Sequence, residues 1–156
     1  MSEVTLRLIT DDNLEDVLAL DVSPVQREYV AGVRDSLDDA DRYPQAMPWY
    51  RAVYAGDEAV GFVMISDNAP PGDPEVLGPY FLWRLLIDAH HQDRGYGRAT
   101  LDQVVDYVRT RPSATELLTS VHPGDEGSPM GFYRRYGFVD AGFDHEGERV
   151  LRLTLG

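Results

Sequence analysis

Hydrophobic and polar residues follow two periods along this chain, one near two residues and one near 3.6. Residues 4–9 alternate, with Val4, Leu6 and Leu8 on one side, which predicts a half-exposed strand. Residues 79–88 are apolar at nearly every position, as is typical of a strand buried on both faces. Strand-like patterns occur over residues 4–9, 49–54, 59–66, 79–88, 115–121, 138–143 and 149–155.

Helical signals separate several of these strands. The clearest lies at residues 95–110, where four apolar residues share one face before Pro112 stops the helix. Three other helices are expected. One follows the Thr10 cap, one runs from Ser23 to about Asp35, and one spans residues 129–136. A short polar turn is expected over residues 36–42.

The order of these elements predicts an α/β (α+β) fold with a mixed, mostly antiparallel sheet. Three consecutive strands before residue 88 suggest a meander. The strand–helix–strand unit over residues 79–121 requires one parallel pair with a right-handed crossover. No repeat or linker divides the chain, so residues 1–156 are expected to form one domain.

Composition narrows the possible chemistry. The chain has no cysteine, so disulfides, thiolate nucleophiles and zinc–thiolate sites are excluded. A formal net charge of −13 at pH 7 disfavours nucleic acid and favours a cationic ligand. No apolar run reaches the roughly 20 residues that span a bilayer, and the first residues lack the features of a secretory signal. We therefore expect a cytoplasmic protein without membrane or nucleic-acid partners.

A glycine-containing loop, Gln92 to Ala99, lies between a predicted strand and a predicted helix. Glycines allow a phosphate to approach the backbone, and the helix N-terminus attracts anions. The loop lacks the Gly-Lys-Ser/Thr end of a P-loop, and Thr100 stands where a dinucleotide fingerprint has its third glycine. Coenzyme A is the third nucleotide ligand to consider.

Two motifs resemble those of the GNAT family of N-acetyltransferases. Gln92-x-x-Gly95-x-Gly97 resembles the acetyl-CoA loop, and Phe132-Tyr133-x-x-x-Gly137-Phe138 resembles a signature near the family's C-terminus. The resemblance covers essentially the whole chain. It implies a sheet of about seven strands flanked by about four helices. It also implies that acetyl-CoA is the co-substrate and that no metal is needed.

The resemblance also implies roles for individual residues in acetyl-CoA binding. Backbone groups of residues 85–87 would contact the pantetheine arm, and N–H groups of residues 93–98 would hold the pyrophosphate. The family often has a cofactor-binding asparagine where this chain has Glu126, and Ser128 is the expected substitute. The residues expected to bind acetyl-CoA are Leu85, Leu86, Ile87, Gln92, Asp93, Arg94, Gly95, Tyr96, Gly97, Arg98, Ser128 and Tyr133.

Catalysis would be a direct attack of a primary amine on the thioester. Tyr133 matches the family tyrosine that protonates the departing thiolate, since a phenol can donate that proton. A backbone N–H near Leu86 would polarise the carbonyl. Glu28 is the first candidate for the general base, and Asp88 is a second.

The sequence specifies the acceptor less closely than it specifies acetyl-CoA. Short segments resemble bacterial polyamine or diamine acetyltransferases, so a small cationic amine is the first hypothesis, with Tyr29, Tyr80 and Trp83 as its binding residues. An aminoglycoside, another antibiotic amine or a protein N-terminus is the alternative. A non-catalytic acyl-CoA sensor is an alternative of another class. Many members of the family are dimers, so a homodimer is possible.

Overall fold

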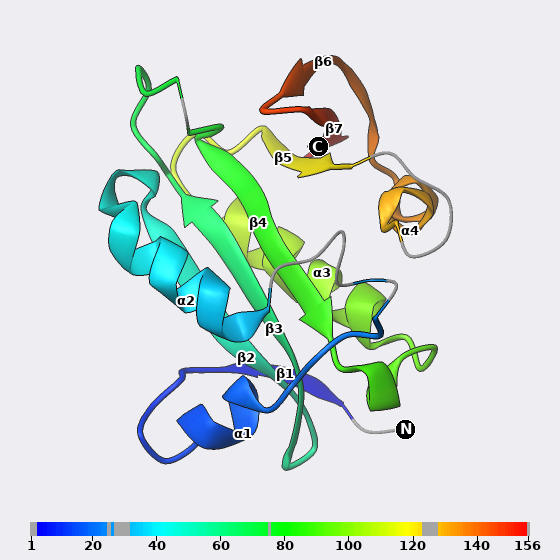
Figure 1. The fold of residues 1–156 in the computed structure, drawn as a ribbon. Helices are drawn as coiled ribbons and strands as arrows, with labels where there is room; N and C mark the ends of the chain where they lie inside the picture. Colours follow the sequence, from blue (N-terminus) through cyan, green and yellow to red (C-terminus); the bar gives the residue numbers. More distant parts are fainter. Residues whose placement is uncertain (1–2, 25, 27–31, 75, 123–127, 156) are drawn as a thin grey trace.

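The computed structural model contains one seven-stranded sheet with helices on both faces (Figure 1). It describes residues 3–24, 26, 32–74, 76–122 and 128–155. The strands lie in the order β1-β2-β3-β4-β5-β7-β6, and only β4 and β5 pair in parallel. Their bounds are β1 Val4–Arg7, β2 Pro48–Ala55, β3 Glu58–Asp67, β4 Tyr80–Ile87, β5 Glu116–Val121, β6 Val139–His145 and β7 Glu148–Thr154.

Helices cover both faces of this sheet. Helices α1 and α2 pack on one face, where Val17 and Val33 join a cluster with Phe62 and Leu86. Helices α3 and α4 pack on the other, where Leu101 and several neighbours form a second cluster. The helices described are α1 Leu14–Leu18, α2 Val33–Arg42, α3 Tyr96–Arg109 and α4 Met130–Tyr136, with short 3-10 helices η2 Pro44–Ala46 and η3 Ala89–His91. The predicted mixed sheet of seven strands with four flanking helices is therefore confirmed.

No helix within the described ranges is long and apolar enough to span a bilayer.

Two helix predictions need correction. The polar turn expected over residues 36–42 is part of α2, because the small side chains of Ser36 and Ala40 are buried and extend the apolar stripe begun by Val33. Helix α1 begins at Leu14, one turn later than the Thr10 cap predicted. A third prediction, the helix expected to start at Ser23, falls largely on residues 25 and 27–31, which lie outside the described residues.

A β-bulge in β4 lies beside the functional region. Met64 of β3 pairs with Arg84 and Ile65 pairs with Leu82, so Trp83 is the extra residue on β4. A bulge bends its strand and reverses the alternation of side chains. As a result Trp83 packs with the α1/α2 cluster and Leu85 with the α3/α4 cluster.

Strands β4 and β5 separate directly beside this bulge. They pair only at Phe81 with Leu118 and at Leu82 with Thr119. The remainder of β4, from Trp83 to Ile87, has no paired partner on β5. One edge of β4 is therefore open over its last residues, in the middle of the sheet (Figure 1).

Candidate active site

The open edge of β4 exposes the peptide groups of Leu85 and Ile87. Asp88 N donates to Val60 O, so the adjacent pair of Ile87 with Gly61 is a non-hydrogen-bonded one. Hydrogen-bonded and non-hydrogen-bonded residue pairs alternate along two antiparallel strands. The N–H and C=O of Leu86 therefore point toward β3, and those of Leu85 and Ile87 point away from it. The side chain of Leu86 is also buried, at 1% exposure. This geometry contradicts the expectation that Leu86 binds the cofactor or polarises its carbonyl, and the peptide groups free on this edge are those of Leu85 and Ile87.

A cavity of about 730 Å³ runs along this edge to the glycine loop. Ten of the twelve residues predicted to bind acetyl-CoA line it: Leu85, Ile87, Gln92, Asp93, Gly95, Tyr96, Gly97, Arg98, Ser128 and Tyr133. Arg94 is exposed and does not line the cavity. We call this space the donor cavity.

The start of α3 presents unpaired N–H groups to the donor cavity. Gly95 caps the helix in the left-handed conformation (φ 81°), and no side chain caps it. The first backbone bond inside the helix runs from Ala99 N to Gly95 O at 3.0 Å, so the preceding N–H groups have no partner within the helix. Together with the guanidinium groups of Arg98 and Arg135 in the wall, they suit a pyrophosphate.

Gly97 has a second role that the motif did not reveal. A Cβ atom added at this position would lie 3.2 Å from Cζ of Phe132 on α4. The missing side chain therefore lets α3 and α4 approach each other at the floor of the donor cavity. The two motifs recognised in the sequence are in direct contact here.

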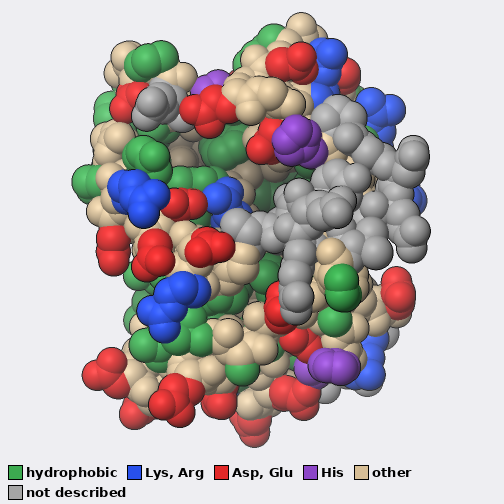
Figure 2. All heavy atoms as spheres, viewed as in Figure 1, with side chains coloured by type: hydrophobic (Ala, Val, Ile, Leu, Met, Phe, Trp, Pro, Cys, Tyr) green, Lys and Arg blue, Asp and Glu red, His purple; other side chains and the backbone are tan. Residues whose placement is uncertain are grey.

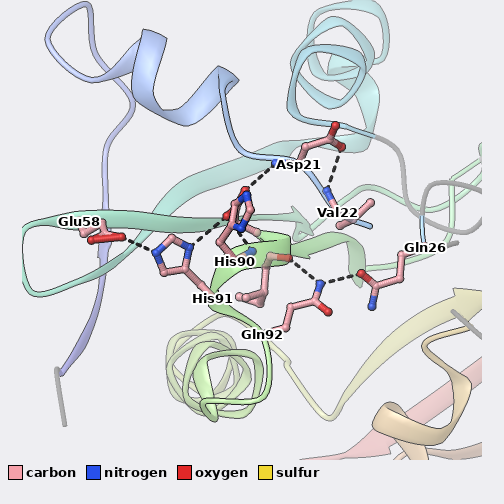
Figure 3. Close-up of polar contacts among 9 residues, drawn as sticks. Asp21, Val22, Gln26, Glu58, His90, His91 and Gln92 are labelled. Atoms are coloured by element: carbon pink, nitrogen blue, oxygen red, sulfur yellow. Dashed lines mark hydrogen bonds and ion pairs between the residues drawn. The ribbon is translucent and has the colours of Figure 1, made fainter. Parts of the chain in front are cut away.

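The side chain of Gln92 hydrogen-bonds the last residue of β4. Its Nε2 donates to Ile87 O at 2.9 Å and to Oε1 of Gln26 at 2.6 Å (Figure 3). The amide thus fixes the peptide group of Ile87 and connects the glycine loop to the segment after α1.

A neighbouring network holds the turn between β4 and α3. The Asp88 carboxylate accepts from Asp21 N at 2.9 Å and from His90 N at 3.1 Å, and it contacts His91 Nδ1 at 3.1 Å (Figure 3). His91 Nε2 in turn contacts the carboxylate of Glu58 at the start of β3. These contacts join three segments that are distant in sequence.

Asp88 is consequently a structural residue. Burial alone would raise the pKa of its carboxyl, but the N–H groups of Asp21 and His90 and the ring of His91 together lower it. A carboxylate with a lowered pKa and three donors is a poor proton acceptor. Asp88 also lines neither cavity. Its proposed role as general base is therefore wrong.

A second cavity, of about 560 Å³, lies across the separated ends of β4 and β5. Figure 2 shows a hollow in this face with acidic and histidine side chains gathered around it. Its wall contains carboxylates, imidazoles and aromatic rings: Asp39, Glu146, Glu148, His122, His145, Tyr43, Phe81 and Trp83. We call this space the acceptor cavity.

The two cavities meet at Leu85, Pro129 and Tyr133, which line both. Tyr133 is 6% exposed and lies beside Thr119, whose hydroxyl donates to Leu82 O at 3.0 Å. Burial raises the pKa of the Tyr133 phenol, so the group keeps its proton at neutral pH. A protonated phenol therefore stands at the junction of the two cavities.

The aromatic residues predicted to bind the acceptor do not lie at one site. Trp83 lines the acceptor cavity, near Tyr43 at 6.4 Å between ring centroids. Tyr80 does not: it is 1% exposed in the α3/α4 cluster, and its hydroxyl donates to Pro112 O at 2.6 Å. Tyr80 therefore has no surface for a ligand, and its proposed role is wrong. Tyr29 and Glu28 lie outside the described residues, as does Glu126.

Sequence reasoning missed the polar residues on the far wall of the acceptor cavity. Glu148 and His145 belong to the β6–β7 hairpin, and His122 follows β5. The sequence signal was weak, because both histidines fell in predicted loops. Only the pairing of β5 with β7 brings these residues to the open edge of β4. Among the described residues, no group of three or more His, Asp or Glu side chains is arranged to hold a metal ion.

Comparisons with known proteins give matches over most of the chain. Residues 14–138 match the acetyltransferase (GNAT) family. A protein of Bacillus subtilis subsp. natto named "probable spermine N(1)-acetyltransferase" is 28% identical over 156 residues, which cover 97% of this chain and 99% of that protein.

Solved structures show the same fold. The PaiA N-acetyltransferase of Thermoplasma acidophilum in complex with coenzyme A has a TM-score of 0.67 at 14% identity, covering 97% of this chain and 99% of that one. A GNAT family acetyltransferase from Elizabethkingia anophelis with acetyl-CoA bound has a TM-score of 0.64 at 15% identity, covering 99% and 100%.

Proposed function

Because this chain belongs to the acetyltransferase (GNAT) family and is an acetyl-CoA-dependent N-acetyltransferase, we propose that its acceptor is a small polycationic amine, with a polyamine or diamine first. The name of the Bacillus relative supports this choice. The observation that carries it is the acceptor cavity, whose wall combines three carboxylates with aromatic rings. Ammonium groups bind well to both kinds of surface.

In the proposed reaction, acetyl-CoA occupies the donor cavity with its pyrophosphate at the start of α3. Its pantetheine arm follows the open edge of β4, where Leu85 and Ile87 offer peptide groups as a neighbouring strand would. The thioester then reaches the junction beside Tyr133. A peptide N–H of this edge, at Leu85 or Ile87, polarises the thioester carbonyl.

The acceptor amine loses a proton to solvent, and its neutral nitrogen attacks the carbonyl carbon. The resulting tetrahedral intermediate collapses with cleavage of the carbon–sulfur bond. Tyr133 donates its proton to the departing thiolate, and the new amide nitrogen gives up its second proton, which restores the phenol through water. The chain has no cysteine, so no cysteinyl acyl-enzyme can form, which agrees with direct transfer.

The alternative acceptors differ in size and in charge. An aminoglycoside is also polycationic and would be attracted by the same carboxylates, so the name of the Bacillus relative is what places the polyamine first; a peptide N-terminus carries only one ammonium group of its own. A non-catalytic acyl-CoA sensor has no need of a protonated phenol between two cavities, and the family activity is acetyl transfer.

A panel of amines tests the proposed acceptor. Spermidine, spermine, putrescine, an aminoglycoside and a short peptide would be compared at saturating acetyl-CoA, with release of free coenzyme A followed by a thiol reagent. Because the protein has no cysteine, that reagent reports coenzyme A alone. We expect the polyamines or the diamine to give the highest kcat/KM. A higher value for the aminoglycoside or the peptide would refute the proposed acceptor.

A further inference from the structure

Glu148 occupies a defined position on the wall of the acceptor cavity. It is the first residue of β7 and pairs with His145 of β6. The β5–β7 register pairs Val121 with Arg149, and its continuation places His122 opposite Glu148. Residues opposite each other on neighbouring strands point to the same face, and all three line the cavity. They form a row of imidazole, carboxylate and imidazole across three strands.

The three carboxylates of this cavity differ in their partners. Asp39 forms an ion pair with Arg84, at 3.0 Å between Oδ2 and the guanidinium. Glu146 lies at the turn with its side chain 66% exposed, and water screens a charge there. Glu148 is half-buried and accepts a hydrogen bond from the neutral Ser120 hydroxyl at 3.1 Å. Among the described residues, none forms an ion pair with Glu148 within 4 Å, so its negative charge is available to a ligand.

Ser120 places this carboxylate close to the reaction. It follows Thr119, which forms the last pair between β5 and β4, so it stands where the two strands separate. Thr119 on one face of β5 contacts Tyr133, and Ser120 on the other contacts Glu148. Glu148 is therefore held beside the opening through which the thioester meets the acceptor.

The opposite wall, on β4, carries the ion pair of Arg84 with Asp39, whose charges largely offset each other. Among the described residues, Glu148 is the half-buried carboxylate of this cavity without such an ion pair. An ammonium group in the cavity is therefore attracted mainly to the β7 wall. This attraction orients an acceptor that carries charge away from its reacting nitrogen.

We propose that Glu148, held by Ser120, binds a second ammonium group of the acceptor and so selects amines with more than one charge. This inference rests on the proposed polycationic acceptor. Glu148 is a specificity-determining residue in this account. The proton-donor role stays with Tyr133.

A matched pair of amines isolates this contact. 1,6-Diaminohexane and hexylamine have the same carbon chain, and only the former has a second ammonium group. In the wild-type enzyme we expect the diamine to have the higher kcat/KM. Glu148→Gln should lower the value for the diamine by about ten- to a hundredfold, as expected for a charge-assisted hydrogen bond, with little change for hexylamine. Ser120→Ala should give a smaller loss in the same direction.

Asp144→Asn is the control, because Asp144 lies on the same hairpin, outside both cavities, and its loss removes the same charge. It should keep the diamine preference, and all variants should keep the KM for acetyl-CoA. An unchanged preference in Glu148→Gln would overturn the assignment of Glu148, and so would an equal loss for both amines. If the wild-type enzyme acetylates no polycation, the proposed acceptor fails, which is a different result.

Discussion

Replacing Tyr133 with Phe tests the chemistry at the junction of the two cavities. The change removes one buried hydroxyl and keeps the ring, which packs 5.3 Å from Phe132 and 5.4 Å from Phe138 between centroids. Thr119 still donates to Leu82 O at 3.0 Å, so no donor is left unsatisfied. Removal of this hydroxyl should therefore cost about 1 kcal/mol of unfolding free energy or less.

The effect on turnover should be far larger. General acid catalysis typically contributes about 10²- to 10⁴-fold. A thiolate, with a pKa near 8.5 for an ordinary thiol, is a fair leaving group, which places the expected loss in kcat at about a hundredfold. Because burial raises the pKa of Tyr133, the wild-type enzyme should show no alkaline decline from this phenol up to about pH 10.

The assay is coenzyme A release at saturating acetyl-CoA and spermidine, with calorimetric affinity for coenzyme A and thermal unfolding measured on the same samples. Tyr136→Phe is the matched control. Tyr136 is on the same helix, donates to Asp102 at 2.8 Å and lines neither cavity. We expect Tyr136→Phe to keep wild-type kcat. If Tyr133→Phe also keeps it, the proton-donor role is refuted.

Three further predictions concern the framework of the site. Gly61→Ala would place a Cβ 2.4 Å from Leu86 O, so we expect a loss of about 1–3 kcal/mol in urea unfolding, and an unchanged midpoint would contradict the close approach of β3 and β4. Gln92→Ala removes the bond to Ile87 O and should raise the KM for acetyl-CoA several-fold with kcat little changed; a loss confined to kcat would contradict this. The lowered pKa of Asp88 stabilises the protein above its unfolded pKa near 3.9, and that contribution disappears as pH falls through the folded value. The stability difference between wild type and Asp88→Asn should therefore be widest above about pH 5 and narrow toward pH 3, and a constant difference would contradict the role of ionised Asp88.

Much of the fold could be predicted because its elements have clear periods. The alternation in residues 4–9 and the apolar stripe of α3 depend only on local sequence, and both elements formed where expected. Helix α2 was misjudged because Ser36 and Ala40 are weakly hydrophobic and become buried only when the helix packs on the sheet.

The donor site was more predictable than the acceptor site. The glycine loop and its helix are contiguous in sequence, so their geometry could be anticipated. The peptide directions of Leu86 and its neighbours depend on the β3–β4 register, which includes a bulge at Trp83 that no local pattern reveals. Simple alternation could have shown that Tyr80 and Trp83 point to opposite faces. Glu148 reaches the site only through the pairing of β5 with β7.

The central claim is that the donor and acceptor cavities are two halves of one active site that meet at Tyr133. The most direct measurement is the affinity, by calorimetry, for a conjugate in which spermidine is joined covalently to the sulfur of coenzyme A. If both cavities are occupied together, the conjugate should bind about a hundredfold or more tightly than coenzyme A, because linkage makes the second contact intramolecular. An affinity equal to that of coenzyme A alone would show that the acceptor cavity does not receive the amine.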